Sequence, residues 1–423
     1  MAAAVPTMPR MGPTFAICFV AYAFSQLDLA LFAYALPSIR KEFSTSLVGV
    51  GAVIAFAYVI GGFLQVGMGH MTDRWGRKRL LMVASGASSL FVAAHALAAG
   101  PIGLAIARAG AIGTGGALYP ATGAIVTEVA PARYRGLFAG GLQIAYPFGW
   151  FLASLCAAPI LVYFGWRAVF LVALATLPFV FVIGRYLKET ERFTNANAQR
   201  LEKPTLVASL RAMLAPGLKR RTITLFFAQY FFVLAYGGSS LLLPTYFHEH
   251  RGFPLSISAY LVGIGNAVSI LGYLAAAWIG EFLLTRRTTV VIFTLIGAFG
   301  FLVMLWVPQG FYPTLAVFAV TSIFFYGTAA VKAAYIAELF PTELRATGIA
   351  VCGSLPVNLG IATGPLAIAL AVERIGWQLA LSWMVAVPLV GAGLLYLLLK
   401  PVPSGLEVEE VQAHLQQQGR TYG

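Results

Sequence analysis

Hydrophobic residues along the chain occur in blocks of about twenty or more, separated by short polar segments. A block of this length crosses the roughly 30 Å hydrocarbon core of a bilayer as an α-helix. The blocks lack the residue-by-residue alternation of a membrane barrel, and a helix satisfies all of its own backbone groups in lipid. Charges, Pro and Gly at the block ends predict twelve helices, at 13–37, 47–71, 79–99, 101–127, 136–162, 166–187, 221–247, 255–279, 288–307, 312–337, 346–371 and 376–399.

The predicted helices form two sets of six, so the expected fold is an all-α integral membrane protein with two similar halves. The first half covers 1–187, and a polar linker follows at 188–220. The second half covers 221–400, and a polar tail occupies 401–423.

Landmark residues recur between the halves at a nearly constant offset, which indicates an internal repeat. Pro37 corresponds to Pro244 at an offset of 207 residues. A Glu-x-x-Pro-x-x-x-Arg segment beginning at Glu128 recurs at Glu338, at an offset of 210. Two copies of one six-helix unit are expected to enclose a central site at their interface.

Composition and charge narrow the class further. Hydrophobic residues make up 59% of the chain and charged residues only 10%, which excludes a water-soluble fold. The net charge of +13 does not indicate a nucleic-acid partner, because nearly all of the charges lie in short loops. Lys and Arg are concentrated after predicted helices 2, 4, 6, 8 and 10, so both termini and the linker are expected to face the cytoplasm.

The loop after the second helix reads Gly-His-Met-Thr-Asp-Arg-Trp-Gly-Arg-Lys-Arg from Gly69 to Arg79. Its Gly-x-x-x-Asp-Arg-x-Gly-Arg-Lys pattern resembles the signature that the major facilitator superfamily carries at this position. The alternative is a solvated basic loop that only sets topology. Gly69 would permit close helix approach, and Asp73 could meet a helix N-terminus or an arginine.

The resemblance implies that these residues open and close the cytoplasmic side and do not contact substrate. Two further Glu and Arg pairs at cytoplasmic helix ends would belong to the same gate. The predicted gating residues are Gly69, Asp73, Arg74, Gly76, Arg77, Lys78, Glu128, Arg135, Glu338 and Arg345.

Within the superfamily, the chain resembles the sugar-porter branch and the branch of aromatic-acid and metabolite:proton symporters. The resemblance is carried by Asp28 in helix 1, by Arg108 with a run of glycines in helix 4, and by the segment that begins at Glu128. It implies a multi-pass protein of a bacterial inner membrane that works as a secondary transporter.

Asp28 is the most informative single residue, because a carboxylate inside a membrane helix costs several kcal/mol unless it is paired or protonated. Helix 1 ends near Pro37, so Asp28 lies about nine residues, or ~13 Å, below the outer end. Arg108 lies about seven residues, or ~10 Å, below the same end of helix 4. The two side chains are therefore expected to meet and to act as a proton switch. The alternative is a permanent ion pair that only fixes helix packing.

Lys332 is a second charge well inside a predicted span, about six residues before Glu338. A cation that faces a cavity can bind an anionic group of a substrate. Its alternative role is to reach the cytoplasmic headgroups along its own flexible stem.

Other polar and aromatic side chains are predicted near the middle of the membrane. Such groups either join helices or line a cavity. The predicted substrate-binding residues are Tyr22, Gln143, Tyr146, Gln229, Tyr230, Asn266, Lys332 and Asn358.

Together these features predict a proton-coupled symporter that imports a small organic anion, a carboxylate, by alternating access. The alternative is a symporter of the same fold for a sugar or other neutral metabolite. We expect no enzymatic activity, metal or cofactor, because no metal-ligand or nucleophile motif is found. The expected partners are a small-molecule substrate, protons and the lipid bilayer, and the protein is expected to be a monomer. Of the histidines, only His95 is near a membrane end, and most are predicted to be bystanders.

Overall fold

The computed structural model describes residues 11–131, 135–189, 206–340 and 344–401. Throughout these ranges the regular elements are helices. Twelve helical segments among them are long and apolar enough to cross a membrane. The predicted all-α membrane fold with twelve spanning segments is therefore confirmed.

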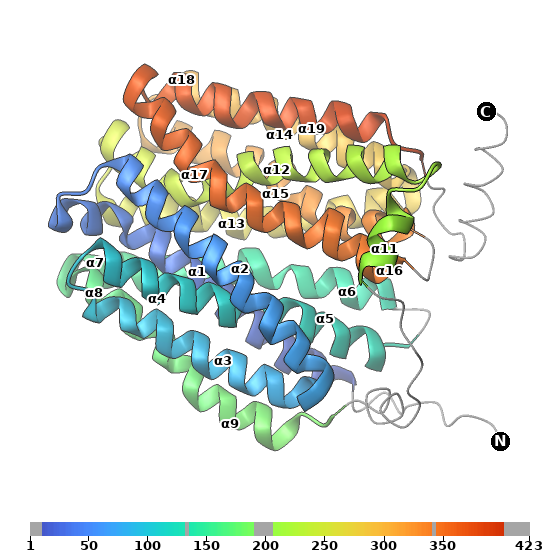
Figure 1. Ribbon diagram of the computed structural model, residues 1–423. Helices are drawn as coiled ribbons and strands as arrows, with labels where there is room; N and C mark the ends of the chain where they lie inside the picture. Colours follow the sequence, from blue (N-terminus) through green and yellow to red (C-terminus); the bar gives the residue numbers. More distant parts are fainter. Residues whose placement is uncertain (1–10, 132–134, 190–205, 341–343, 402–423) are drawn as a thin grey trace, which may run out of the picture. The chain divides into compact units, whose positions relative to one another are not determined.

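The first six spans are drawn in blue to green in Figure 1. Several spans consist of two or more consecutive helical segments. The elements are α1 (Met11–Phe43), α2 (Leu47–Trp75), α3 (Arg77–Ala94), η2 (His95–Leu97), α4 (Pro101–Gly115), α5 (Leu118–Val129), α6 (Arg135–Gln143), α7 (Ala145–Tyr163), α8 (Gly165–Leu171), η4 (Val172–Ala175) and α9 (Thr176–Tyr186).

The second six spans follow a short helix, α11, and continue from yellow-green to red. Several of them contain a single turn of π-helix. The elements are α11 (Leu206–Met213), α12 (Lys219–Thr245), η5 (Tyr246–His250), α13 (Leu255–Trp278), η6 (Ile279–Leu283), α14 (Arg286–Trp306), α15 (Phe311–Glu338), α16 (Arg345–Ile349), η7 (Ala350–Ser354), α17 (Leu355–Ile375), α18 (Trp377–Leu381), η8 (Ser382–Ala386) and α19 (Val387–Leu397).

The structure interrupts two helices that the sequence predicted as continuous, at 101–127 and at 136–162. The first break follows Gly115, where α4 ends, and α5 begins three residues later at Leu118. Gln65 of α2 donates its amide Nε2–H to the carbonyl oxygen of Gly116 at 2.8 Å. This carbonyl is free for Gln65 because Pro120, four residues later, has no backbone N–H to donate to it. A proline inside a helical stretch is an established cause of a kink. The glycines also allow α2 to lie close, since a Cβ at Gly113 would stand 2.5 Å from Leu64.

The chain forms two compact units, Met1–Leu201 with Leu241–Ala267, and Glu202–Ser240 with Val268–Gly423. The segment 241–267 therefore packs with the first unit, although the sequence repeat assigns it to the second half. In the first unit, Arg40 at the end of α1 forms an ion pair with Glu249 of η5. The predicted domain boundary at 188–220 stays a prediction.

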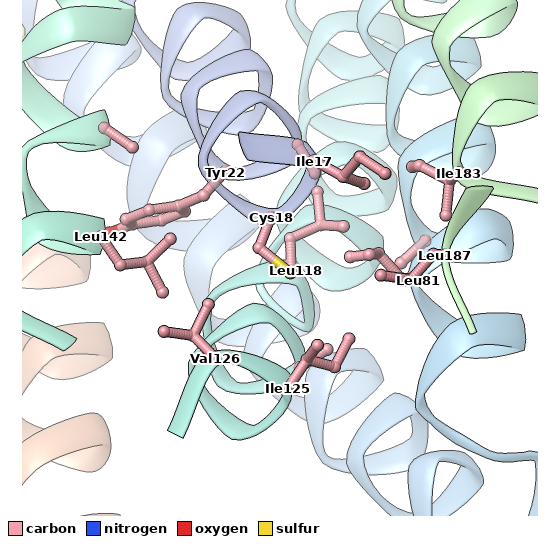
Figure 2. Close-up of a cluster of buried hydrophobic side chains, with 14 of the residues drawn as sticks. Ile17, Cys18, Tyr22, Leu81, Leu118, Ile125, Val126, Leu142, Ile183 and Leu187 are labelled. Atoms are coloured by element: carbon pink, nitrogen blue, oxygen red, sulfur yellow. The ribbon is translucent and has the colours of Figure 1, made fainter. Parts of the chain in front are cut away.

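Each unit has its own apolar core. In the first unit, α1, α3, α5 and α9 contribute Cys18, Leu81, Leu118, Ile125 and Ile183 to one cluster, shown in Figure 2. The second unit has a matching cluster that includes Leu225, Tyr335, Phe340 and Tyr396.

Many large apolar side chains remain exposed on the outer faces of the helices. Phe63 is 74% exposed and Phe181 is 75% exposed. Such surfaces would cause aggregation in water but are suited to contact with lipid chains.

Candidate functional site

Asp28 and Arg108 are both buried inside the first unit. Asp28 of α1 is 4% exposed and Arg108 of α4 is 2% exposed. Arg108 directs its Nη2–H toward the carbonyl oxygen of Leu29 at 3.4 Å. Its guanidinium carbon lies 4.3 Å from the centre of the Phe32 ring, an arrangement typical of a cation–π contact.

The two charged groups do not form a direct ion pair among the described residues. They are nevertheless close enough for a Coulombic interaction. Oδ1 of Asp28 and Nε of Arg108 are both buried without a hydrogen-bond partner. The sequence predicted that Arg108 holds the charged carboxylate, whereas here the guanidinium turns toward Phe32. A pair without a closed contact can rearrange more easily than a permanent ion pair.

The sequence analysis missed two members of this buried group, Tyr58 and His95. Tyr58 of α2 is 6% exposed and lies within Coulombic range of Arg108. His95, in η2 at the end of the third span, is 0% exposed and also interacts with Arg108. A histidine and a tyrosine inside apolar blocks are weak signals, because either can be an ordinary core residue.

A second polar group in the first unit includes two of the predicted substrate-binding residues. Gln143 at the end of α6 donates its Nε2–H to the hydroxyl of Tyr119 of α5 at 2.7 Å. The rings of Tyr119 and Tyr22 lie 5.1 Å apart. Figure 2 shows Tyr22 of α1 directed toward Leu142, at the edge of the apolar cluster. Tyr119 was not predicted, although its position in the helix 4 block is a signal of the same kind as that of Tyr22.

Two other predicted residues of the first unit make contacts within their own helices. The ring of Tyr146 stacks on that of Trp150 at 6.1 Å. Asn266 of α13 is 1% exposed and donates its Nδ2–H to the carbonyl oxygen of Val262 at 2.9 Å.

Lys332 lies in the second unit, on α15, and is 5% exposed. Its Nζ lies 3.1 Å from the centre of the Phe232 ring of α12. No carboxylate of the described residues forms an ion pair with it. Its burial inside the unit argues against a lysine that extends through lipid to the headgroups.

An aromatic group surrounds Phe232. The ring of Tyr236 stacks on Phe232 at 5.7 Å and on Phe325 at 5.8 Å. Tyr326 meets Tyr236 edge-on at 5.4 Å. Lys332 therefore lies at one end of a cluster of π surfaces, to which α12 and α15 contribute.

The other predicted residues of the second unit are spread over different helices. Gln229 accepts a hydrogen bond from the hydroxyl of Tyr396 at 2.9 Å, which joins α12 to α19. The hydroxyl oxygens of Tyr230 and of Thr363 of α17 lie 3.1 Å apart. Asn358 is half-buried on α17. The bond to Tyr396 indicates a structural role for Gln229, and its contact with substrate stays a prediction.

The signature loop is a tight joint between α2 and α3. Gly76 has φ of 89°, a left-handed conformation that a side chain destabilises by about 1–2 kcal/mol. Arg77, the next residue, forms an ion pair with Glu128 of α5. The structure does not describe the side chains at four other predicted gating positions of the first unit: Gly69, Asp73, Arg74 and Arg135.

Glu189 also contacts the signature loop, and the sequence analysis missed it. Its carboxylate accepts hydrogen bonds from the backbone N–H groups of Arg77 at 3.0 Å and Lys78 at 3.2 Å. These N–H groups open α3, where a helix favours a negative charge. Glu189 thus occupies the N-terminus of α3, whereas the prediction that Asp73 meets a helix N-terminus or an arginine stays a prediction.

The second unit repeats the arrangement in part. Arg286, at the start of α14, forms ion pairs with Glu338 at the end of α15 and with Glu281 of η6. Arg77 and Arg286 thus occupy equivalent places, each bound to the Glu that the internal repeat pairs. The structure does not describe the side chain of Arg345, another predicted gating residue.

The described residues contain no group of three or more His, Cys, Asp and Glu side chains that could hold a metal ion.

Residues 18–285 and 269–417 match the sequence profile of the Major Facilitator Superfamily. The chain belongs to the major facilitator superfamily. The protein is a multi-pass membrane transporter and not an enzyme.

Curated relatives of this protein are transporters. It is 28% identical over 366 residues to the cis,cis-muconate transport protein of Acinetobacter baylyi, covering 84% of this chain and 86% of the relative. It is 24% identical over 374 residues to the 4-hydroxybenzoate transporter of Pseudomonas aeruginosa, covering 82% and 83%. The solved structure of a D-xylose-proton symporter superimposes with a TM-score of 0.74 at 17% identity, over 93% of this chain and 98% of that one. At that identity the symporter structure shows the shared fold alone.

Proposed function

We propose that this transporter imports a small conjugated carboxylate together with protons, by alternating access of its two halves. The observation that carries the substrate class is Lys332, a buried cation without an ion-pair partner among the described residues. A buried, unpaired ammonium is costly. An incoming carboxylate would provide the missing charge and a charge-assisted hydrogen bond.

The surroundings of Lys332 support a substrate with π electrons. Stacked and edge-on rings come from α15, the helix that carries the lysine, and from the neighbouring α12. They are Phe325 and Tyr326 on α15, and Phe232 and Tyr236 on α12. Aromatic side chains favour planar, conjugated groups through offset stacking and edge contacts. The relatives are named for cis,cis-muconate and 4-hydroxybenzoate, which both combine a carboxylate with conjugated double bonds. A sugar offers neither feature.

Proton coupling is proposed from Asp28. It is a buried carboxylate close to Arg108 but without a closed ion pair. Desolvation and the attraction of the nearby arginine act in opposite directions on such a carboxyl group, so it can exchange a proton when its access to water changes.

Uptake into proteoliposomes tests the proposed function. With an imposed pH gradient, alkaline inside, we expect accumulation of labelled 4-hydroxybenzoate that a proton ionophore abolishes. Muconate and nicotinate should compete, whereas xylose and a sulfonate should not. Competition by xylose alone would support the neutral-metabolite alternative. Uptake that ignores both the gradient and every competitor would refute the proposal.

We also propose that the protein is a monomer in a bacterial inner membrane, with both termini in the cytoplasm. The concentration of Lys and Arg in alternate loops supports this orientation. Green fluorescent protein fused after Gly423 should therefore fluoresce, while alkaline phosphatase fused at the same position should be inactive. The reverse pattern would contradict the orientation.

A further inference from the structure

Two side chains beside Phe32 each have a buried polar atom without a hydrogen-bond partner. One atom is Nε2 of His95, an unused acceptor or donor, and the other is Nε of Arg108, an unused donor. The guanidinium of Arg108 lies over the Phe32 ring at 4.3 Å. The imidazole of His95 meets the edge of the same ring at 5.9 Å.

The hydrogen bonds of His95 determine which of its nitrogens carries the proton. Nδ1 lies 2.9 Å from the carbonyl oxygen of Phe91 and 3.0 Å from that of Val92. A carbonyl oxygen can only accept, so Nδ1 must donate. In the neutral ring, Nε2 therefore carries a free lone pair, which suits a guanidinium N–H.

The ring is held in a fixed position. It stacks on Phe170 of α8 at 4.7 Å with an interplanar angle of 19°. Arg108 is the charged group that faces it from α4, and Asp28 of α1 and Tyr58 of α2 lie beside Arg108. On α8, Arg167 is occupied by Glu42 of α1 and by the carbonyl oxygen of Ala98.

We propose that His95 is the alternative hydrogen-bond acceptor for Arg108. When Asp28 is charged, it attracts the guanidinium by its own charge. When Asp28 takes up a proton from water, that attraction is lost, and Arg108 donates instead to Nε2 of His95, which stays neutral throughout. His95 thereby stabilises the protonated state of the switch without carrying the proton, so it is a positioning residue. This role rests on the proposed coupling of transport to Asp28.

The His95→Phe variant tests the role. It retains a ring that can stack on Phe170 but lacks both nitrogens. Without the acceptor, protonation of Asp28 leaves a buried guanidinium unsatisfied, so the protonated state is less favourable. Uptake should then need a more acidic medium, with the pH of half-maximal uptake lower by about one unit than in the wild type. His95→Gln, whose amide oxygen can accept, should restore most of the shift, and substrate exchange in the absence of a gradient should be similar in all three proteins.

The outcomes separate this role from the proposed function. A wild type that does not respond to pH would remove the proposed coupling and the role of His95 with it. A wild type that responds, with an unchanged half-maximal pH in His95→Phe, would overturn the role of His95 alone.

A stability cycle covers the case in which His95→Phe does not transport. Thermal unfolding in detergent is compared for the wild type, His95→Phe, Asp28→Asn and the double variant. His95→Phe should lower the unfolding temperature more in the Asp28→Asn background, where the arginine has lost its charged partner. Equal losses in the two backgrounds would overturn the role.

Discussion

Proteoliposomes that contain the Asp28→Asn variant are expected to lose all accumulation of substrate against its gradient and to retain exchange of substrate across the membrane. Asparagine resembles the protonated carboxyl in shape and charge but cannot release a proton. The variant can therefore still alternate while it binds substrate, but the proton gradient no longer drives it. For one proton per substrate, a pH difference of one unit supports about ten-fold accumulation, and this should fall to none.

Asp28→Glu is the matched control, because it retains a titratable group on the same helix. It should keep part of the gradient-driven uptake, with exchange as the common measure of correctly folded protein. Uphill uptake by Asp28→Asn at the wild-type level would exclude Asp28 as the coupling residue. Loss of exchange together with uptake would instead indicate that Asp28 is needed for the fold.

Replacing Lys332 with methionine is expected to weaken binding of 4-hydroxybenzoate by about 10-fold to 100-fold. This factor corresponds to one charge-assisted hydrogen bond of about 1.5–3 kcal/mol. Methionine keeps the length and the contact with Phe232 while it removes the charge. Binding can be measured by titration calorimetry or by inhibition of exchange.

Two comparisons make this result specific. Lys332→Arg keeps a positive charge that can stack on Phe232, so it should lose less affinity than methionine does. The amide of 4-hydroxybenzoate lacks the carboxylate, so its weak binding should be nearly the same in wild type and Lys332→Met. If Lys332→Met binds the acid as tightly as the wild type does, the lysine does not recognise the anion.

The number of spans could be predicted from the sequence because the signal is long and simple. A block such as 288–307 needs only to be apolar over the thickness of a bilayer, and each of the twelve predicted blocks corresponds to a span. The breaks in the fourth and fifth spans could not be predicted in this way. At the break after Gly115, Pro120 cannot donate to the carbonyl of Gly116, and the amide of Gln65, 51 residues distant in sequence, donates instead. Hydropathy alone carries no information about either feature.

The candidate site was predictable where the cost of burial identifies a residue. Asp28, Arg108 and Lys332 are ionisable groups inside apolar blocks, and the structure buries all three. Amides and phenols gave a weaker signal, because the same side chain can line a cavity or join two helices. Gln229, bonded to Tyr396, and Tyr119, bonded to Gln143, show why the two roles could not be separated from sequence. Glu189 was missed because it is 112 residues from Arg77 in sequence, and only folding of the first unit brings it to the start of α3.

The interruption between α4 and α5 divides one membrane span into two short arms. Arg108 lies on the arm before the break, and Glu128 of the gate lies near the end of the arm after it. An unbroken helix would transmit any tilt at one end to the other as a rigid rod, whereas a joint at a glycine pair absorbs part of it. Under the proposed alternating access, the arm that carries Glu128 would separate from Arg77 while Arg108 keeps its depth in the membrane. Bending at the joint between α4 and α5, rather than charge, would then determine how far opening at the surface near Glu128 displaces Arg108.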